Sequence, residues 1–113
     1  MPERPEIWLV MHDEELVAEL AVEGVDRRWR RGTVSRRQRF DVLAPLFVRE
    51  ARLAAGIGTT PGWWEAYQEV RRLIRLIRPS GDEVPEFILH IDGGRASWRC
   101  LEPTTDPACE VNR

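Results

Sequence analysis

The chain has 113 residues, of which 42% are hydrophobic and 32% are charged, and its formal net charge is -2. This length suits a single domain, and the hydrophobic fraction excludes a disordered chain, which would combine few apolar residues with a large net charge. The near balance of charge gives no general reason to expect nucleic acid or an anionic membrane as a partner.

Strands are expected in the first third of the chain. Residues 7–12 are a compact apolar run, and residues 16–22 alternate between two faces. Asp13-Glu14 between them is short enough for a hairpin turn. A weaker third strand, residues 28–34, carries several arginines, so we expect it at the edge of the sheet, where charge is tolerated.

Two helices are expected next. Ser35 and Gln38 have the spacing of a capping box, and apolar residues then recur every three to four positions. Pro45 interrupts this run, so the helix either kinks there or begins near it with proline in its first turn. A second helix is expected to start at Thr60-Pro61 and to stop at Pro79. Its apolar stripe comprises Trp63, Tyr67, Val70, Ile74 and Ile77.

The chain then returns to strands, residues 87–91 and 96–101, around the turn Asp92-Gly93-Gly94. The order β-β-β-α-α-β-β segregates strands from helices, which predicts an α+β fold with an antiparallel sheet and two helices packed on one face. We expect residues 1–102 to form this single domain and residues 103–113 to be a disordered tail.

The final hairpin carries a resemblance to a known group of proteins. Phe87-Ile88-Leu89-His90-Ile91-Asp92-Gly93, closing with Ala96-Ser97-Trp98-Arg99, resembles the C-terminal end of a group of small actinobacterial proteins. Val25-Asp26 followed by Trp29, and Phe40 followed by Pro45-Leu46-Phe47, are similar to the same group. No activity is assigned to that group, so the resemblance implies this fold and a bacterial, cytoplasmic source but no catalytic residues.

The two cysteines, Cys100 and Cys109, form neither a CxxC motif nor a disulfide framework. We expect Cys100 in the core, Cys109 as a free thiol and no bridge between them. Residues 1–6 lack the apolar stretch of a signal peptide, and no apolar run approaches the roughly 20 residues that span a bilayer. A reduced, cytoplasmic environment without a membrane partner is therefore expected.

All 17 basic residues are arginines, and seven of them fall within residues 27–39, a stretch that contains no acid. One hypothesis is a phosphate or nucleic-acid site with Trp29 available for stacking. The alternative, which we favour, is a solvated segment balanced by the first 26 residues, with eight acids against one arginine. The candidate phosphate-binding residues are Arg27, Arg28, Trp29, Arg30, Arg31, Arg36, Arg37 and Arg39.

A second candidate site comprises His12, His90, Asp92 and Arg99, with Ser97 nearby. If the two histidines share the open face of the sheet, a His-Asp pair there would suit a general base or a metal site. The chain has no HExxH motif, paired carboxylates or nucleophile elbow, so we favour surface histidines without function. No cofactor or metal is expected, no catalytic residue is assigned, and whether the chain is an enzyme stays open.

A third candidate is an interface on the open face of the sheet. If Ile7, Leu9 and Met11 face the helices, apolar residues remain on the opposite face, which should otherwise be polar. Such a patch predicts an interface anchored by a tryptophan, unless a helix, a loop or the tail covers it. The predicted interface residues are Trp8, Val10, Val17, Ile88 and His90.

Three functions follow, in order of preference. The first is a small interaction or accessory module that binds a protein partner or a second copy of itself. The second is a small-ligand binder or enzyme with the His/Asp site. The third is a phosphate or nucleic-acid binder that uses the arginine-rich segment.

Overall fold

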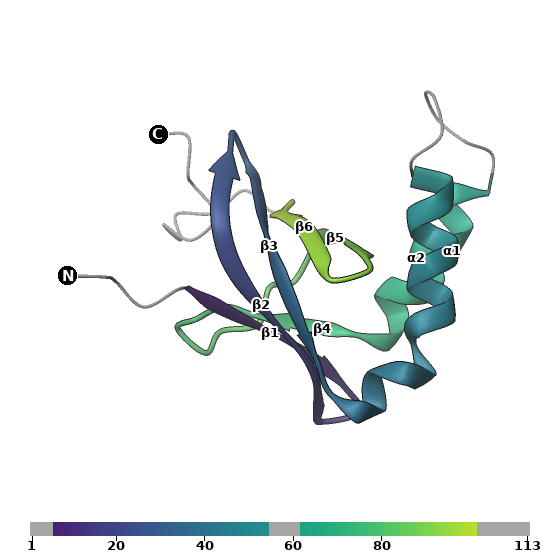
Figure 1. Ribbon diagram of the computed structural model, residues 1–113, viewed down its shortest axis with the longest axis horizontal. Coiled ribbons are helices and arrows are strands. Elements are labelled where there is room, and N and C mark those ends of the chain that lie inside the picture. Colours follow the sequence, from purple (N-terminus) through teal and green to yellow (C-terminus); the bar gives the residue numbers. More distant parts are fainter. Residues whose placement is uncertain (1–5, 55–61, 102–113) are drawn as a thin grey trace.

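The computed structural model describes residues 6–54 and 62–101 (Figure 1). Within these residues, six strands form one antiparallel sheet in the order β4-β1-β2-β3-β6-β5. The strands are β1 (Ile7–His12), β2 (Glu15–Asp26), β3 (Trp29–Arg36), β4 (Arg75–Ile77), β5 (Phe87–Asp92) and β6 (Arg95–Cys100). Between β3 and β4 lie the short 3-10 helix η1 (Gln38–Val42) and the helices α1 (Ala44–Ala54) and α2 (Trp63–Leu73). Figure 1 shows α1 and α2 side by side on one side of the curled sheet, which confirms the α+β class.

One face of the sheet holds the core. Trp8 and Val10 of β1 lie opposite Leu20 and Ala18 of β2, and all four side chains are fully buried. The Trp8 ring meets Trp98 of β6 edge to face, with ring centroids 6.0 Å apart. The helical region contributes Phe40, Leu43, Phe47, Val70 and Ile74 to the same cluster. Burial of large aromatic and aliphatic side chains at this centre holds helices and sheet together.

The side chains of β1 face the opposite sides of the sheet from those expected. Trp8 and Val10 point into the core, whereas Ile7, Leu9 and Met11 are only half-buried. Val17 is also fully buried, beside a register shift that places Val10 opposite Ala18 and Met11 opposite Leu16. Every residue from Ile7 to Met11 is apolar, so nothing in the sequence marks the outer face of this strand. The strand β5 has the expected phase, with Phe87, Leu89 and Ile91 buried.

The strand β3 lies between β2 and β6, so the prediction of an edge strand is wrong. An inner strand can hold these arginines because the Arg30 side chain is buried in the core, where only 3% of the residue is exposed. The Arg30 guanidinium lies 4.9 Å from the Trp8 ring centroid, and its Nε is 3.4 Å from a Glu6 oxygen. A cation over an indole face and an adjacent carboxylate offset the cost of burying the charge.

The helices begin and end differently from the simplest expectation. The residues expected to form the first helical turn form the separate 3-10 helix η1. The helix α1 starts at Ala44 with Pro45 in its first turn, so the helix begins near Pro45 and does not kink there. The helix α2 ends at Leu73 because Ile74 is extended, and Arg75–Ile77 then form β4 beside β1. The expected continuation to Pro79 is therefore wrong, and the start at Thr60-Pro61 falls outside the described residues. No helix in the described ranges is long and apolar enough to cross a membrane.

Cys100 closes β6 and is buried, as expected for a core residue. It is disulfide-bonded and is not a free thiol, so the expectation that no bridge forms is wrong for this residue. The cysteines consequently give no support to a reduced environment. The expectations for Cys109 and for a disordered tail at residues 103–113 fall outside the described residues.

Candidate functional site

A carboxylate and an imidazole meet where α1 lies against β5. His90 of β5 is on the face opposite Leu89 and Ile91, because successive side chains of a strand alternate. Its Nδ1 is 2.6 Å from Oε2 of Glu50 on α1. The same oxygen accepts a hydrogen bond of 2.8 Å from the indole Nε1 of Trp63, the first residue of α2. A single carboxylate oxygen therefore links β5 to both helices.

Glu50 is fully buried, although it is a charged residue type. Its second oxygen, Oε1, has no hydrogen-bond partner within the described residues. A buried carboxylate is costly unless it is paired and hydrogen-bonded, so Glu50 depends on its contacts with His90 and Trp63. An apolar residue at this helix position would stabilise the fold without this cost.

The contact with Glu50 determines which nitrogen of His90 is available. An ionised Glu50 can only accept, and in that state Nδ1 carries the proton of this hydrogen bond. In the neutral imidazole the other nitrogen, Nε2, then keeps its lone pair. No described residue forms a hydrogen bond with Nε2, and 25% of the His90 side chain is exposed. The ring thus has one buried, anchored edge and remains partly open to solvent.

Two indole rings hold the imidazole in place. Trp29 of β3 stacks on His90 with ring centroids 5.6 Å apart and an interplanar angle of 17°. Trp63 lies at 6.4 Å in a tilted arrangement and stacks in turn on Tyr67. The Tyr67 hydroxyl donates a hydrogen bond to the carbonyl oxygen of Phe87. Burial raises the pKa of the Tyr67 phenol above its usual value, which keeps this donor protonated.

A basic hollow of about 390 Å³ adjoins Trp29 and is lined by Arg27, Arg28, Trp29 and Arg99; we call it the arginine hollow. Arg27 and Arg28 form the turn between β2 and β3, whereas Arg99 comes from β6. The Arg99 guanidinium lies 5.8 Å from the Trp29 ring centroid. None of these three arginines forms an ion pair with a described carboxylate, and the shielded Nε of Arg99 has no hydrogen-bond partner there. Guanidinium groups gathered without counter-charges favour an anion.

The backbone of this turn is unfavourable for arginine. Arg27 has a φ of 60°, in the left-handed region. That conformation costs a residue with a Cβ about 1–2 kcal/mol, and hairpin turns normally place glycine or asparagine there. Arg27 therefore occupies a costly backbone position at the edge of the arginine hollow.

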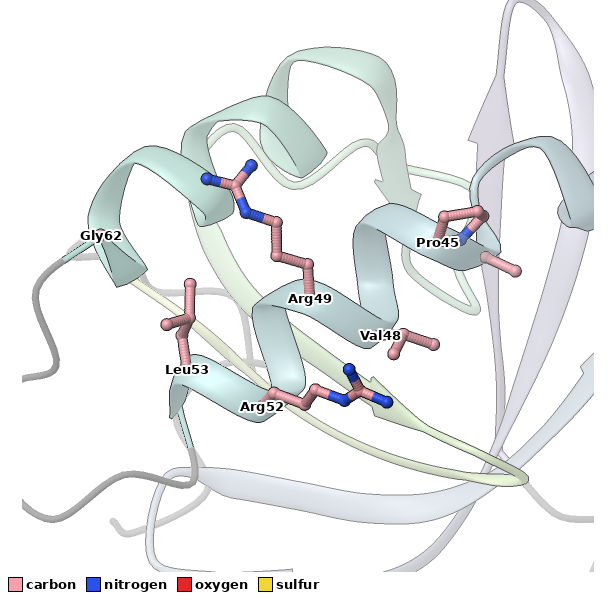
Figure 2. A pocket seen from close by; sticks show the side chains of 7 residues that line it. Pro45, Val48, Arg49, Arg52, Leu53 and Gly62 are labelled. Carbon is pink, nitrogen blue, oxygen red and sulfur yellow. The ribbon is translucent and has the colours of Figure 1, made fainter.

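A larger hollow lies elsewhere, on the outer surface of α1 near the start of α2 (Figure 2). It measures about 660 Å³ and is lined by Ala44, Pro45, Val48, Arg49, Arg52, Leu53 and Gly62. Figure 2 shows Arg49 and Arg52 extending in different directions, and Arg49 is paired with Glu69 at 2.7 Å. This wall offers no proton donor or acceptor comparable to His90, and it adjoins residues 55–61, which are not described. We therefore place the candidate site at His90 and the arginine hollow, although that hollow is smaller.

The expected ligand site is only partly assembled. His90 and Arg99 both approach the Trp29 ring. His12 is on β1, 3.5 Å from Asp13, and the strands β2, β3 and β6 separate β1 from β5. Asp92 is exposed and lies opposite Arg95 in the final hairpin. His12 and Asp92 therefore do not join His90 and Arg99.

Three of the five predicted interface residues are buried in the core. Trp8, Val10 and Val17 have no exposed surface, so none of them can contact a partner in the folded chain. Ile88 and His90 are half-buried on the outer face of β5, as expected. The reversed phase of β1 removes the tryptophan that would have anchored the surface.

The arginine-rich segment is divided among several roles. Arg37 and Arg39 pair with Glu19 and Glu15 of β2, at 2.9 and 2.7 Å. Arg36 donates to the carbonyl oxygen of Gly93 and covers the Phe40 ring. Arg30 is buried and Arg31 is exposed, which leaves Arg27, Arg28 and Trp29 at the arginine hollow. The favoured interpretation, a segment balanced by preceding acids, is confirmed for Arg37 and Arg39.

Sequence analysis missed Glu50 as a site residue and treated Trp63 only as part of an apolar stripe. Glu50 follows Leu43 and Phe47 at a spacing of four and then three residues, which is the apolar face of a helix. A carboxylate at such a position was the available signal. Its partner His90 is 40 residues away, so sequence spacing could not reveal the pair.

Within residues 6–54 and 62–101, no group of three or more His, Cys, Asp or Glu side chains is arranged to hold a metal ion. Comparisons with protein families, curated proteins and solved structures find no match to this chain. The resemblance of the final hairpin to the actinobacterial group therefore stays a prediction.

Proposed function

We propose that this protein binds a small phosphorylated molecule in the arginine hollow. The observation that carries the proposal is the convergence of Arg27, Arg28 and Arg99, from two separate segments, without a carboxylate partner among the described residues. Guanidinium groups match the oxygens of a phosphate group and bind them through paired, charge-assisted hydrogen bonds. The hollow volume of about 390 Å³ is within the usual range for small-ligand sites.

This proposal joins parts of two of the three functions expected from sequence. The candidate ligand residues His90 and Arg99 both lie beside Trp29, and Arg99 lines the arginine hollow together with Arg27 and Arg28. A small ligand is preferred to nucleic acid because three of the other arginines in the segment do not extend the basic surface. Arg30 is buried, and Arg37 and Arg39 are neutralised by glutamates. A protein interface ranks lower once Trp8 is in the core.

Calorimetric titration with inorganic pyrophosphate at low ionic strength tests the proposal. We expect saturable binding to the full chain and an affinity lower by about tenfold or more in Arg99→Gln, because a charge-assisted hydrogen bond contributes about 1.5–3 kcal/mol. Arg52→Gln is the matched control, because Arg52 is exposed on α1 and lines the other hollow. Absence of binding to the wild-type chain, or an equal loss in Arg52→Gln, would overturn the proposal.

Arg27→Gly separates binding from folding at the same site. Glycine relieves the left-handed backbone, so the free energy of unfolding should rise by about 1 kcal/mol. The affinity for pyrophosphate should fall, because one of the three guanidinium groups is lost. If affinity is unchanged while stability rises, Arg27 is not part of the binding site.

A further inference from the structure

We infer that His90 is a general base at this site, so that the protein hydrolyses a phosphate ester that binds in the arginine hollow; this inference rests on the proposed function. Glu50 is then the residue that positions His90, and Trp29 is the wall shared by the base and the anion site.

The buried contact resembles what a proton-transfer pair requires. A carboxylate that accepts from Nδ1 fixes the tautomer and the orientation of an imidazole, which leaves Nε2 as the base. Glu50 supplies this carboxylate at 2.6 Å, from a position with no solvent access. Trp63 donates to the same oxygen and restrains it further. The pair comes from two elements, α1 and β5, so the rigid part of the fold holds its geometry.

The His90 ring and the Arg99 guanidinium lie beside the same indole ring. The His90 ring centroid is 5.6 Å and the Arg99 guanidinium 5.8 Å from the centroid of Trp29. A phosphate ester with its anionic group in the hollow and its leaving group directed away from β5 would expose phosphorus to a water molecule on the His90 side, which is the in-line arrangement for attack. Arginine donors beside the phosphoryl group stabilise the negative charge that develops in the transition state.

The proposed reaction uses water and no other reactant. Nε2 of His90 removes a proton from a water molecule, and the water oxygen forms a bond to phosphorus. The bond between phosphorus and the leaving oxygen breaks, and the leaving oxygen takes the electron pair. The protonated imidazole then releases its proton to solvent, which restores the neutral ring, and a basic leaving oxygen takes its proton from solvent.

Hydrolysis of bis(4-nitrophenyl) phosphate tests the inference with a leaving group that needs no proton. We expect turnover above the rate in buffer, and a fall in kcat of about 100-fold or more in His90→Gln, which is the usual contribution of a general base. His12→Gln is the matched control, because His12 is on β1 and contacts Asp13. Its kcat should stay within about twofold of wild type. If His90→Gln hydrolyses the diester as fast as the wild-type chain does, the activity comes from a contaminant and the inference is overturned.

Glu50→Gln tests the positioning role through kcat, KM and the state of the ring. We expect kcat to fall by about tenfold or more while KM changes little, since Glu50 does not touch the substrate. The nitrogen NMR signals of His90 should show a proton on Nδ1 in the wild-type chain and a changed tautomer balance in Glu50→Gln. A kcat equal to wild type in a folded Glu50→Gln, or a proton on Nε2 in the wild type, contradicts the assignment.

Trp63→Phe covers the case in which Glu50→Gln does not fold. This variant removes one donor to Glu50 and leaves the contact with His90, so we expect a smaller fall in kcat than in His90→Gln. Pyrophosphate binding separates the two proposals. If the wild-type chain binds pyrophosphate without turning over the diester, the catalytic inference fails and the binding proposal stands. If it does neither, both fail.

Discussion

Backbone conformation at three residues in the described ranges is unusual for their type. Asp13, Glu14 and Arg27 have φ values of 51°, 67° and 60°. Each lies in a two-residue hairpin turn, where a positive φ makes the turn match the twist of the strands. Glycine and asparagine adopt this conformation at little cost, whereas other residues lose about 1–2 kcal/mol. Arg27 lines the proposed binding site, but Asp13 and Glu14 have no comparable reason for the strain.

Glu14→Gly is therefore expected to raise the free energy of unfolding by about 1 kcal/mol. The pairing of Glu14 with Arg75 offsets little of this gain, because the atoms are 3.8 Å apart and the Glu14 side chain is 90% exposed. Urea denaturation at neutral pH measures the change. Ala21→Gly, in the regularly paired part of β2, is the control and should lose about 0.5–1 kcal/mol. A loss in both variants would show that the first turn is not strained.

Tyr67 gives the chain a specific response to alkali. The chain has no lysine and a single tyrosine, so few side chains titrate near pH 10. Burial is the main cause that raises the Tyr67 pKa above 10.0, and the Arg71 charge opposes it only in part. The raised folded-state pKa means that the native state keeps the phenolic proton when the unfolded state has lost it. This contribution to stability is complete below pH 10.0 and is lost progressively as pH rises above that value.

Tyr67→Phe removes both the titration and the hydrogen bond to Phe87. We expect the variant to lose about 1 kcal/mol of stability at neutral pH, which is the usual net contribution of such a bond. Between about pH 9 and pH 11 its stability should fall less steeply than that of wild type. Urea denaturation across this range provides the measurement. Parallel pH profiles for the two proteins would contradict the assigned burial of the phenol.

At the level of elements, the sequence predicts a strand well when polar residues mark its outer face. In β5 and β6, His90, Ser97 and Arg99 alternate with buried residues, and both phases were predicted correctly. In β1 no polar residue interrupts Ile7 to Met11, so pairing with β2 decides the phase. The three-residue strand β4 was missed because Val70, Ile74 and Ile77 also fit one continuous helical stripe. Three residues give too short a pattern to distinguish the two periods.

Pairing of β2 with β3 depends on a glycine at close approach. Gly32 lies opposite Val22, next to a register shift in β2. A Cβ at Gly32 would lie 1.8 Å from the carbonyl oxygen of Ala21, which is backbone and cannot rotate away. Gly32→Ala should therefore destabilise the chain by about 3 kcal/mol or more, at the upper end of overpacking costs. Gly94→Ala, where a Cβ meets nothing within 4 Å, is the control for thermal or urea denaturation. Equal stability of the two variants would contradict this strand pairing.

At the scale of the whole molecule, several arginines of the described residues are paired with glutamates of β2. Arg37, Arg39 and Arg95 pair with Glu19, Glu15 and Glu23 of β2. The acidic opening segment predicted this balance from composition alone, because antiparallel neighbours of opposite sign attract. The sequence could not predict which arginines remain unpaired, since that depends on the strand order β3-β6-β5. This order brings Arg99 of β6 beside Trp29 and leaves an excess of positive charge at the arginine hollow.

The whole arrangement depends on Trp8 at the centre of the core. Its ring contacts Trp98 and the Arg30 guanidinium, and its Nε1 donates to Glu6 at 3.1 Å. Trp8→Glu replaces this ring with a buried carboxylate and a cavity, so we expect a loss of about 4 kcal/mol or more and unfolding at ordinary temperature. Val42→Glu is the control, because Val42 is 72% exposed, and it should change stability by less than about 0.5 kcal/mol. Circular dichroism with urea denaturation distinguishes the variants.

If Trp8→Glu kept the wild-type unfolding transition and altered only the molecular mass in solution, Trp8 would lie on an outer, self-associating surface. The sheet would then have to face its helices with Leu9 and Met11, and Trp98 would lack the ring against which it packs.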